Sequence, residues 1–249
     1  MKIYGYSERG AMNALFYEMA LMKDSDKEFV KFLEIANVPN ANDYQNFKIY
    51  NECSLSRFGT PDLVVVAQRE NVNVVFFIEG KVSECSGFRM ESIIKEYKDT
   101  KKRPNSSNLL FQIRQKQNLY NFRNSLPDSS KVVKIDDKIE TSLGTRSIGN
   151  NPIVRKFVDV IKNCQEAKYI AIVPDISNED NEWKNKLEKE GFNELLFISW
   201  ESIRKNFSSY KLLNDTFEFN EGDDPRIKTP SKKKKSQILN NPIKQITIN

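Results

Sequence analysis

The chain has 249 residues, a net charge of +5 and no histidine. The absence of histidine excludes Ser-His-Asp and Cys-His catalysis and histidine-ligated zinc sites, so any chemistry must use carboxylates, lysine, hydroxyls or thiols. The apolar runs are far shorter than the roughly 18–20 residues of a membrane span, and no secretory leader is visible. Three widely spaced cysteines, Cys53, Cys85 and Cys164, fit free thiols. We therefore expect a cytoplasmic protein without a membrane partner.

Most of the net charge lies at the C-terminus. Residues 221–249 hold seven basic and three acidic side chains and no aromatic residue, which is typical of a disordered basic tail. The other 220 residues carry a net charge of +1, so the total charge is weak evidence that the folded part binds nucleic acid. We expect one domain over residues 1–220, followed by this tail.

The first 55 residues predict two helices and a strand. Apolar residues at helical spacing predict a first helix over residues 8–22. Ser25, with Glu28 three residues later, predicts a capping box that opens a second helix, which ends near Pro39. The segment 47–55 reads as a strand that leads into the next element.

Two apolar runs, 63–67 and 74–78, flank a short polar break and predict a β-hairpin. Runs that are apolar at every position are typical of strands in the middle of a sheet covered on two sides. If the turn is centred between residues 70 and 71, Asp62 lies opposite Glu79, with Cβ atoms about 4.5–5.5 Å apart. Side chains alternate along a strand, so Lys81 emerges on the same face as Glu79. The hairpin therefore predicts a cluster of two carboxylates and a lysine.

After the hairpin the pattern predicts helices over residues 89–97 and 108–126. Between residues 85 and 125 nine basic residues stand against three acidic ones, a local charge of +6. A charge run is more often only a solvated surface, but its position directly after the acidic hairpin favours phosphate contacts. The basic residues for which we expect nucleic-acid contacts are Lys95, Lys98, Lys101, Lys102, Arg103, Arg114 and Lys116.

The C-terminal half alternates between helices and strands. Residues 127–151 read as an irregular segment with one short strand near 131–135. The elements expected after it are a helix over 152–164, a strand over 168–175, an acidic helix over 178–190, a strand over 194–200 and a short helix through 203. Strands and helices that follow a hairpin in this way predict an α/β fold with a mixed sheet.

The order of these features resembles the PD-(D/E)XK nuclease superfamily, which includes restriction endonucleases. The resemblance rests on Pro61-Asp62 and Glu79-x-Lys81, with a helix bearing Glu8 before them and a helix rich in glutamine after them. It covers roughly residues 1–203 in topology. It implies a restriction-endonuclease-like mixed central β-sheet flanked by helices, and a Mg²⁺-dependent endonuclease of restriction or defence type that acts on double-stranded DNA.

The residue types suit this chemistry. Hydrolysis of a phosphodiester needs neutralisation of the phosphate and an activated water, and Mg²⁺, or Mn²⁺ in its place, supplies both when one or two carboxylates hold it. The resemblance implies that Asp62 and Glu79 bind the metal, with the carbonyl of Gly80 as a further ligand. Lys81 would orient or deprotonate the attacking water, or stabilise the phosphate.

The resemblance also implies an acidic residue from the first helix and a glutamine from the helix after the hairpin. We place Glu8 ahead of Glu18 as the acidic metal ligand, because a side chain at a helix start can reach a sheet edge. Either Gln112 or Gln115 suits the glutamine, and their spacing does not decide between them. A homodimer would suit double-strand cleavage, because two strands need two sites.

Two other interpretations stay open. A catalytically inactive protein of the same fold would bind nucleic acid or a protein partner. In an unrelated α/β protein Asp62 would simply start a strand, and Glu79 with Lys81 would form a surface ion pair worth about 1 kcal/mol at most. Glu8 would then only interact with the dipole of its helix.

Overall fold

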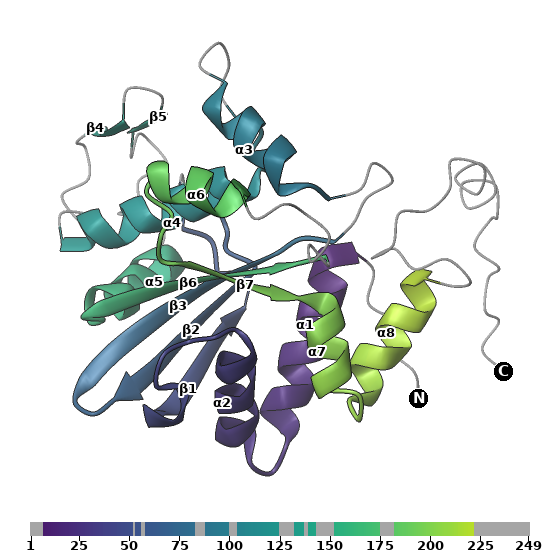
Figure 1. Cartoon of the computed structure of the whole chain (residues 1–249). Helices are drawn as coiled ribbons and strands as arrows, with labels where there is room; N and C mark the ends of the chain where they lie inside the picture. Colours follow the sequence, from purple (N-terminus) through teal and green to yellow (C-terminus); the bar gives the residue numbers. More distant parts are fainter. Residues whose placement is uncertain are drawn as a thin grey trace, which may run out of the picture.

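The computed structural model in Figure 1 describes residues 7–51, 53–55, 58–82, 88–99, 104–124, 132–136, 139–142, 152–174 and 182–221. Its centre is a five-stranded sheet in the order β1-β2-β3-β6-β7. The strands are β1 (Tyr44–Asn51), β2 (Leu63–Arg69), β3 (Val72–Gly80), β6 (Glu166–Val173) and β7 (Leu195–Ser199). The pairs from β1 to β3 are antiparallel and those from β3 to β7 are parallel, so the sheet is mixed, as predicted.

Helices cover both faces of this sheet (Figure 1). One face carries α1 (Ser7–Leu21), α2 (Ser25–Ile35), α7 (Trp200–Asn206) and α8 (Lys211–Glu221). The other face carries α3 (Met90–Lys98), α4 (Leu109–Phe122), α5 (Pro152–Lys162) and α6 (Glu182–Lys189). The remaining elements are a short 3-10 helix, η1 (Ala41–Asp43), and a separate sheet of β4 (Val132–Asp136) with β5 (Ile139–Ser142). The predicted α/β class with helices on both sides of a mixed sheet is confirmed.

The central hairpin divides the core into two halves. Val64, Val75 and Phe77 pack toward α3–α6, whereas Val65 and Phe76 pack toward α1, α2, α7 and α8. All five side chains are fully buried. Successive residues of a strand point to opposite faces, so a strand with both faces covered must be apolar at every position. This is why the two runs show no polar alternation.

The register of the hairpin is the one that the sequence predicts. Leu63 pairs with Ile78, and Arg69 pairs with Val72 across a two-residue turn. The first turn residue, Glu70, adopts a left-handed backbone with φ of 54°, an uncommon conformation for a residue other than glycine that tight turns accept. One further step of the same register places Asp62 opposite Glu79 at the end of the sheet.

Two predicted details at the N-terminal side are wrong. The capping box fails because Asp24, not Ser25, is the N-cap residue of α2, and its side chain makes no capping hydrogen bond. The predicted strand 47–55 is displaced, since β1 begins at Tyr44 and ends at Asn51. The register between β1 and β2 shifts next to Asn46, whose φ is 57°. Such an irregularity interrupts the alternation of side chains along the strand, so the sequence pattern does not show where β1 begins.

Further differences lie in the second half of the chain. The predicted helix 108–126 ends at Phe122 in the structure, and Asn108 caps its start by accepting hydrogen bonds from two backbone amides. Where one strand was expected near 131–135, the structure has the β4–β5 pair. Helix α8 was not predicted, although the buried Leu213 and Phe217 have the spacing of one helix face.

Several expectations fall outside the described residues. Residues 222–249 of the predicted tail lie outside the described residues, and Glu221 is the last residue of α8. Cys85 also lies outside the described residues. Cys53 and Cys164 carry free thiols, as expected. Over the ranges that the structure describes, every helix is too short or too polar to cross a bilayer.

Candidate functional site

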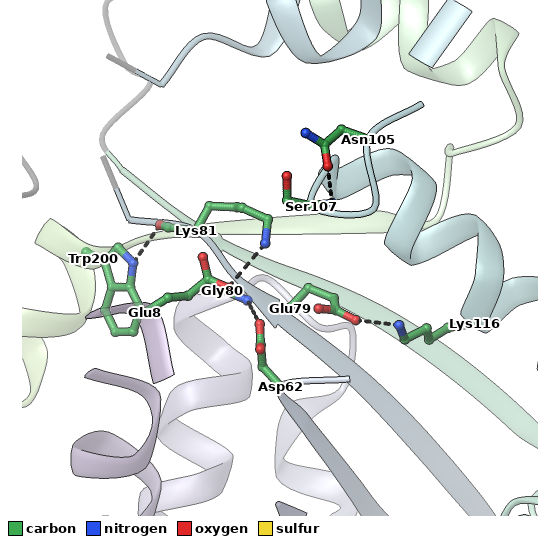
Figure 2. A network of polar contacts seen from close by, with 9 residues as sticks. All are labelled: Glu8, Asp62, Glu79, Gly80, Lys81, Asn105, Ser107, Lys116 and Trp200. Atoms are coloured by element: carbon green, nitrogen blue, oxygen red, sulfur yellow. Dashed lines mark hydrogen bonds and ion pairs between the residues drawn. The ribbon is translucent and has the colours of Figure 1, made fainter. Parts of the chain in front are cut away.

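The C-terminal end of β3 brings together the two acidic residues of the predicted motif (Figure 2). Asp62 lies just before β2, Glu79 is the second-last residue of β3, and both side chains are buried. Oδ2 of Asp62 accepts a hydrogen bond from the backbone N–H of Gly80 at 2.8 Å. The carboxylate of Asp62 is thereby held against the end of the strand that carries Glu79.

The carboxylate of Glu79 meets a lysine from α4. Nζ of Lys116 lies 2.9 Å from its Oε1, and the two side chains are 1% and 0% exposed. The contact counts as an ion pair, because neither oxygen of Glu79 has a hydrogen-bond partner of good geometry within the described residues. Burial raises the pKa of Glu79, and the charge of Lys116 opposes this rise. Glu79 is therefore a buried carboxylate balanced mainly by one ammonium.

Lys81 meets a different acid. Its Nζ lies 3.2 Å from Oε1 of Glu8, at the start of α1, and both side chains are partly exposed. Burial raises the pKa of Glu8 to about 7; Lys81 lowers it, and the negative charge of Asp62 adds to the rise. The pKa of Glu8 thus lies well above the ordinary range of a carboxyl group.

The backbone of Lys81 is fixed from two sides. Its N–H donates to the carbonyl of Ile172 on β6 at 2.7 Å, and its carbonyl accepts from Nε1 of Trp200 at 2.9 Å. Lys81 and Glu79 engage partners on helices that cover opposite faces of the sheet, although strand alternation predicts a shared face. The single cluster expected from the sequence is instead two ion pairs, with Asp62 and Gly80 between them (Figure 2).

Gly80 allows α1 to approach this end of β3. A Cβ atom at Gly80 would lie 3.1 Å from Sδ of Met12 and 3.3 Å from Cγ of Glu8. Both distances are tighter than ordinary van der Waals contact, so a larger residue would push α1 away. The small residue in the Glu79-x-Lys81 motif therefore decides how near Glu8 comes to the other acids.

The two candidate acids of α1 have different roles. Glu18 accepts hydrogen bonds from the backbone N–H groups of Lys211 and Leu213. These amides open α8 and have no partner within their own helix, so Glu18 supplies the missing acceptors. Glu8, in contrast, reaches Lys81. The structure thus places Glu8 in the candidate site and Glu18 at a helix end.

The two candidate glutamines also separate. Gln115 is buried against the loop that leads to Asp62, because a Cβ atom at Gly59 would lie 3.0 Å from its Oε1. Gln112 is partly exposed, and its side-chain oxygen has no hydrogen-bond partner in the described part of the chain. Gln115 is therefore the glutamine that lies beside the site.

The basic residues that we expected to contact nucleic acid, as far as the structure describes them, do not form one solvent-facing surface. Lys95 and Lys98 are exposed on α3, and Lys98 pairs with Glu190 at 2.9 Å. Arg114 donates to the carbonyl of Glu190 and stacks over the ring of Phe192. Its guanidinium is thus used in packing α4 against the turn after α6. The expected phosphate contacts at Lys101, Lys102 and Arg103 lie outside the described residues.

The position of Lys116 differs most from its expected place in a basic surface. It is buried and paired with Glu79, so its ammonium belongs to the acidic site. A signal for this burial was present in the sequence: Leu109, Ile113 and Lys116 are spaced as one face of a helix, and the first two are core residues. A lysine on an apolar stripe is rarely buried without an acidic partner.

The oxygen atoms at the candidate site are of the types that bind a divalent cation. Mg²⁺ prefers carboxylate and carbonyl oxygens, and Glu79 offers a buried carboxylate without a hydrogen-bond partner in the described part of the chain. However, within the described ranges no three aspartate, glutamate or cysteine side chains gather closely enough to hold a metal ion. Lys116 and Lys81 each pair with one of the acids.

Comparison with known proteins adds no relative. No protein-family model matches the chain, and neither the curated proteins nor the solved structures give a significant match. Interpretation of the site therefore rests on its own geometry and chemistry.

Proposed function

We propose that this protein is a Mg²⁺-dependent nuclease of the restriction-endonuclease-like PD-(D/E)XK type, acting on double-stranded DNA. The observation that carries the proposal is the meeting of two buried carboxylates, Asp62 and Glu79, at the end of the central hairpin. Lys81 and Glu8 lie at the same strand end. These are the residue types that the Pro61-Asp62 and Glu79-x-Lys81 motifs would use for phosphodiester hydrolysis.

The cost of burying these charges supports a functional origin for this cluster. Taking a carboxylate out of water costs several kcal/mol, and an apolar pair of similar volume is often as stable as a buried ion pair, or more stable. The fold itself therefore gains little from charges at this point. Carboxyl groups whose pKa is raised by burial, as for Glu8 and Glu79, occur preferentially at functional sites.

The proposal gives each side chain a role. Asp62, Glu79 and the carbonyl of Gly80 would hold Mg²⁺, or Mn²⁺ in its place, which when bound supplies charge neutralisation at the phosphate and an activated water. Lys81, oriented by Glu8 and by its two backbone contacts, would bring an ammonium to the phosphate or to the attacking water. Glu8 can hold or release a proton near neutral pH, because its pKa is about 7.

A plasmid-cleavage assay with and without Mg²⁺ or Mn²⁺ tests the proposal. The wild-type chain should nick or cut the plasmid, and Asp62→Asn, Glu79→Gln and Lys81→Met should each reduce the rate about 100-fold or more. Arg69→Met, at the turn end of the hairpin, is the control and should cleave normally. Cleavage retained in a folded Asp62→Asn protein would contradict the mechanism.

A second candidate function is a binding module of the same fold without catalytic activity. The observation in its favour is that Lys116 and Lys81 already neutralise the acids that a metal would need. Such a protein should bind DNA with an affinity that falls steeply with salt, and should cleave it under no metal condition. Gel-shift titrations at two salt concentrations, run beside the cleavage assay, separate the two functions.

A further inference from the structure

Lys116 is the one buried lysine within the described residues. Its ammonium lies 2.9 Å from Oε1 of Glu79. It also lies under the loop that leads to Asp62, because a Cβ atom at Gly59 would be 3.1 Å from its Nζ. One ammonium thus touches both the strand end that carries Glu79 and the loop that carries Asp62.

The Gly59 backbone makes this contact specific. Its φ is +82°, a conformation that residues with a side chain adopt at a cost, and its missing side chain leaves space for the ends of Gln115 and Lys116. The loop before Asp62 therefore rests directly on α4. Displacement of Lys116 would alter the support of that loop as well as the charge at Glu79.

A divalent cation and the Lys116 ammonium would require the same carboxylate. Two cations beside one buried oxygen repel each other strongly, because little solvent screens them. A cation that binds Glu79 must therefore weaken its pairing with Lys116. The second oxygen, Oε2, is buried and lacks a hydrogen-bond partner among the described residues.

We propose that Lys116 is a positioning residue that holds Glu79 as its counter-ion and competes with a divalent cation for that carboxylate. This inference rests on the proposed function, because it assumes that the site takes a divalent cation. In the absence of the cation Lys116 lies 2.9 Å from Glu79 and holds its carboxylate in place. When the cation binds, the ion pair between Lys116 and Glu79 breaks, and the ammonium of Lys116 remains under the Gly59 loop.

Cation binding by the full-length chain, measured by isothermal titration calorimetry without nucleic acid, tests the inference. The probes are Ca²⁺ and Mn²⁺, and the variants are Lys116→Met and Lys116→Gln, which both remove the charge. Each should bind the cations at least about tenfold more tightly than the wild type, since a competing charge is gone. Lys27→Met, which removes an exposed lysine paired with Asp24, is the matched control and should bind as the wild type does.

The outcomes separate the inference from the function on which it rests. If the wild type binds the cations and both folded variants bind them equally well, Lys116 is structural and the inference is wrong. If both variants lose their native circular dichroism, Lys116 is needed for folding itself, which also overturns the inference. If neither the wild type nor any variant binds a divalent cation or cleaves DNA, the proposed metal-dependent function fails as well.

Discussion

The two ends of the β2–β3 hairpin carry ion pairs of similar length in different surroundings. At the turn end, Arg69 and Glu166 are 2.7 Å apart, and their side chains are 26% and 35% exposed. At the other end, Lys116 and Glu79 are 2.9 Å apart and almost fully buried. An exposed pair contributes about 0–1 kcal/mol, whereas loss of one partner from a buried pair leaves an uncompensated charge. Burial, rather than distance, distinguishes the candidate site from an ordinary surface contact.

The largest difference between the two ends should appear when one partner is removed. Lys116→Met should lower the free energy of unfolding by about 3–5 kcal/mol, because Glu79 stays buried without a counter-ion. Glu79→Gln combined with Lys116→Met should recover much of this loss, since no buried charge remains. Urea denaturation without divalent cations measures both effects. Equal stabilities of Lys116→Met and Arg69→Met would contradict the comparison.

The pH dependence of stability tests the acids at the site end. The pKa of Glu8 in the folded protein, about 7, exceeds its ordinary value of 4.5, so the folded chain binds this proton more tightly than the unfolded chain does. Stability should therefore fall as pH rises from about 4.5 to about 7, and Glu79, with a pKa also raised by burial, acts in the same direction.

The contribution of Glu8 to this fall is at most about 3.5 kcal/mol, at about 1.4 kcal/mol per pKa unit. Solvent reduces it, because 25% of the Glu8 side chain is exposed. Glu8→Gln should flatten the profile, as measured by melting temperatures between pH 4.5 and pH 8. In Lys81→Met the fall should extend to higher pH, since Lys81 lowers the pKa of Glu8. An unchanged slope in Glu8→Gln would disprove the assignment.

A smaller effect is expected from the loop before Asp62. Gly59→Ala and Gly191→Ala both place a side chain on a backbone with positive φ, +82° and +76°, and each should cost about 1–2 kcal/mol of stability. Only Gly59 contacts Gln115 and Lys116, whereas Gly191 faces Arg114. Gly59→Ala should therefore also impair cleavage or cation binding, and Gly191→Ala should not. Equal activities at matched stability would show that the Gly59 contact has no functional role.

The smallest effect is expected at the turn end. Arg69→Met should change the free energy of unfolding by about 1 kcal/mol or less, and the change should shrink as salt is added, because solvent reaches both side chains. Melting temperatures at 0.05 M and 1 M salt measure this. A larger and salt-insensitive loss would mean that the two ends of the hairpin do not differ in the way that their burial indicates.

Local patterns accounted for much of the fold. The spacing of apolar residues located most helices, and the uninterrupted apolar runs indicated a sheet covered on two sides. The errors arose where a feature depends on distant contacts. Helix α8 is held partly by Glu18 of α1, and β1 follows the edge of β2 with an irregular register. Neither contact can be recognised from the pattern of residues close to it in the sequence.

The same division applies to the site. From the sequence alone follow the hairpin, its two-residue turn and the meeting of Asp62 with Glu79, because strand alternation and a short turn are local properties. The tertiary structure decided which cation meets each acid, since Lys116 comes from α4 and the partner of Lys81 comes from α1. A helix can approach a strand end from either face of a sheet. The choice depends on packing over the whole core, which no spacing of residues specifies.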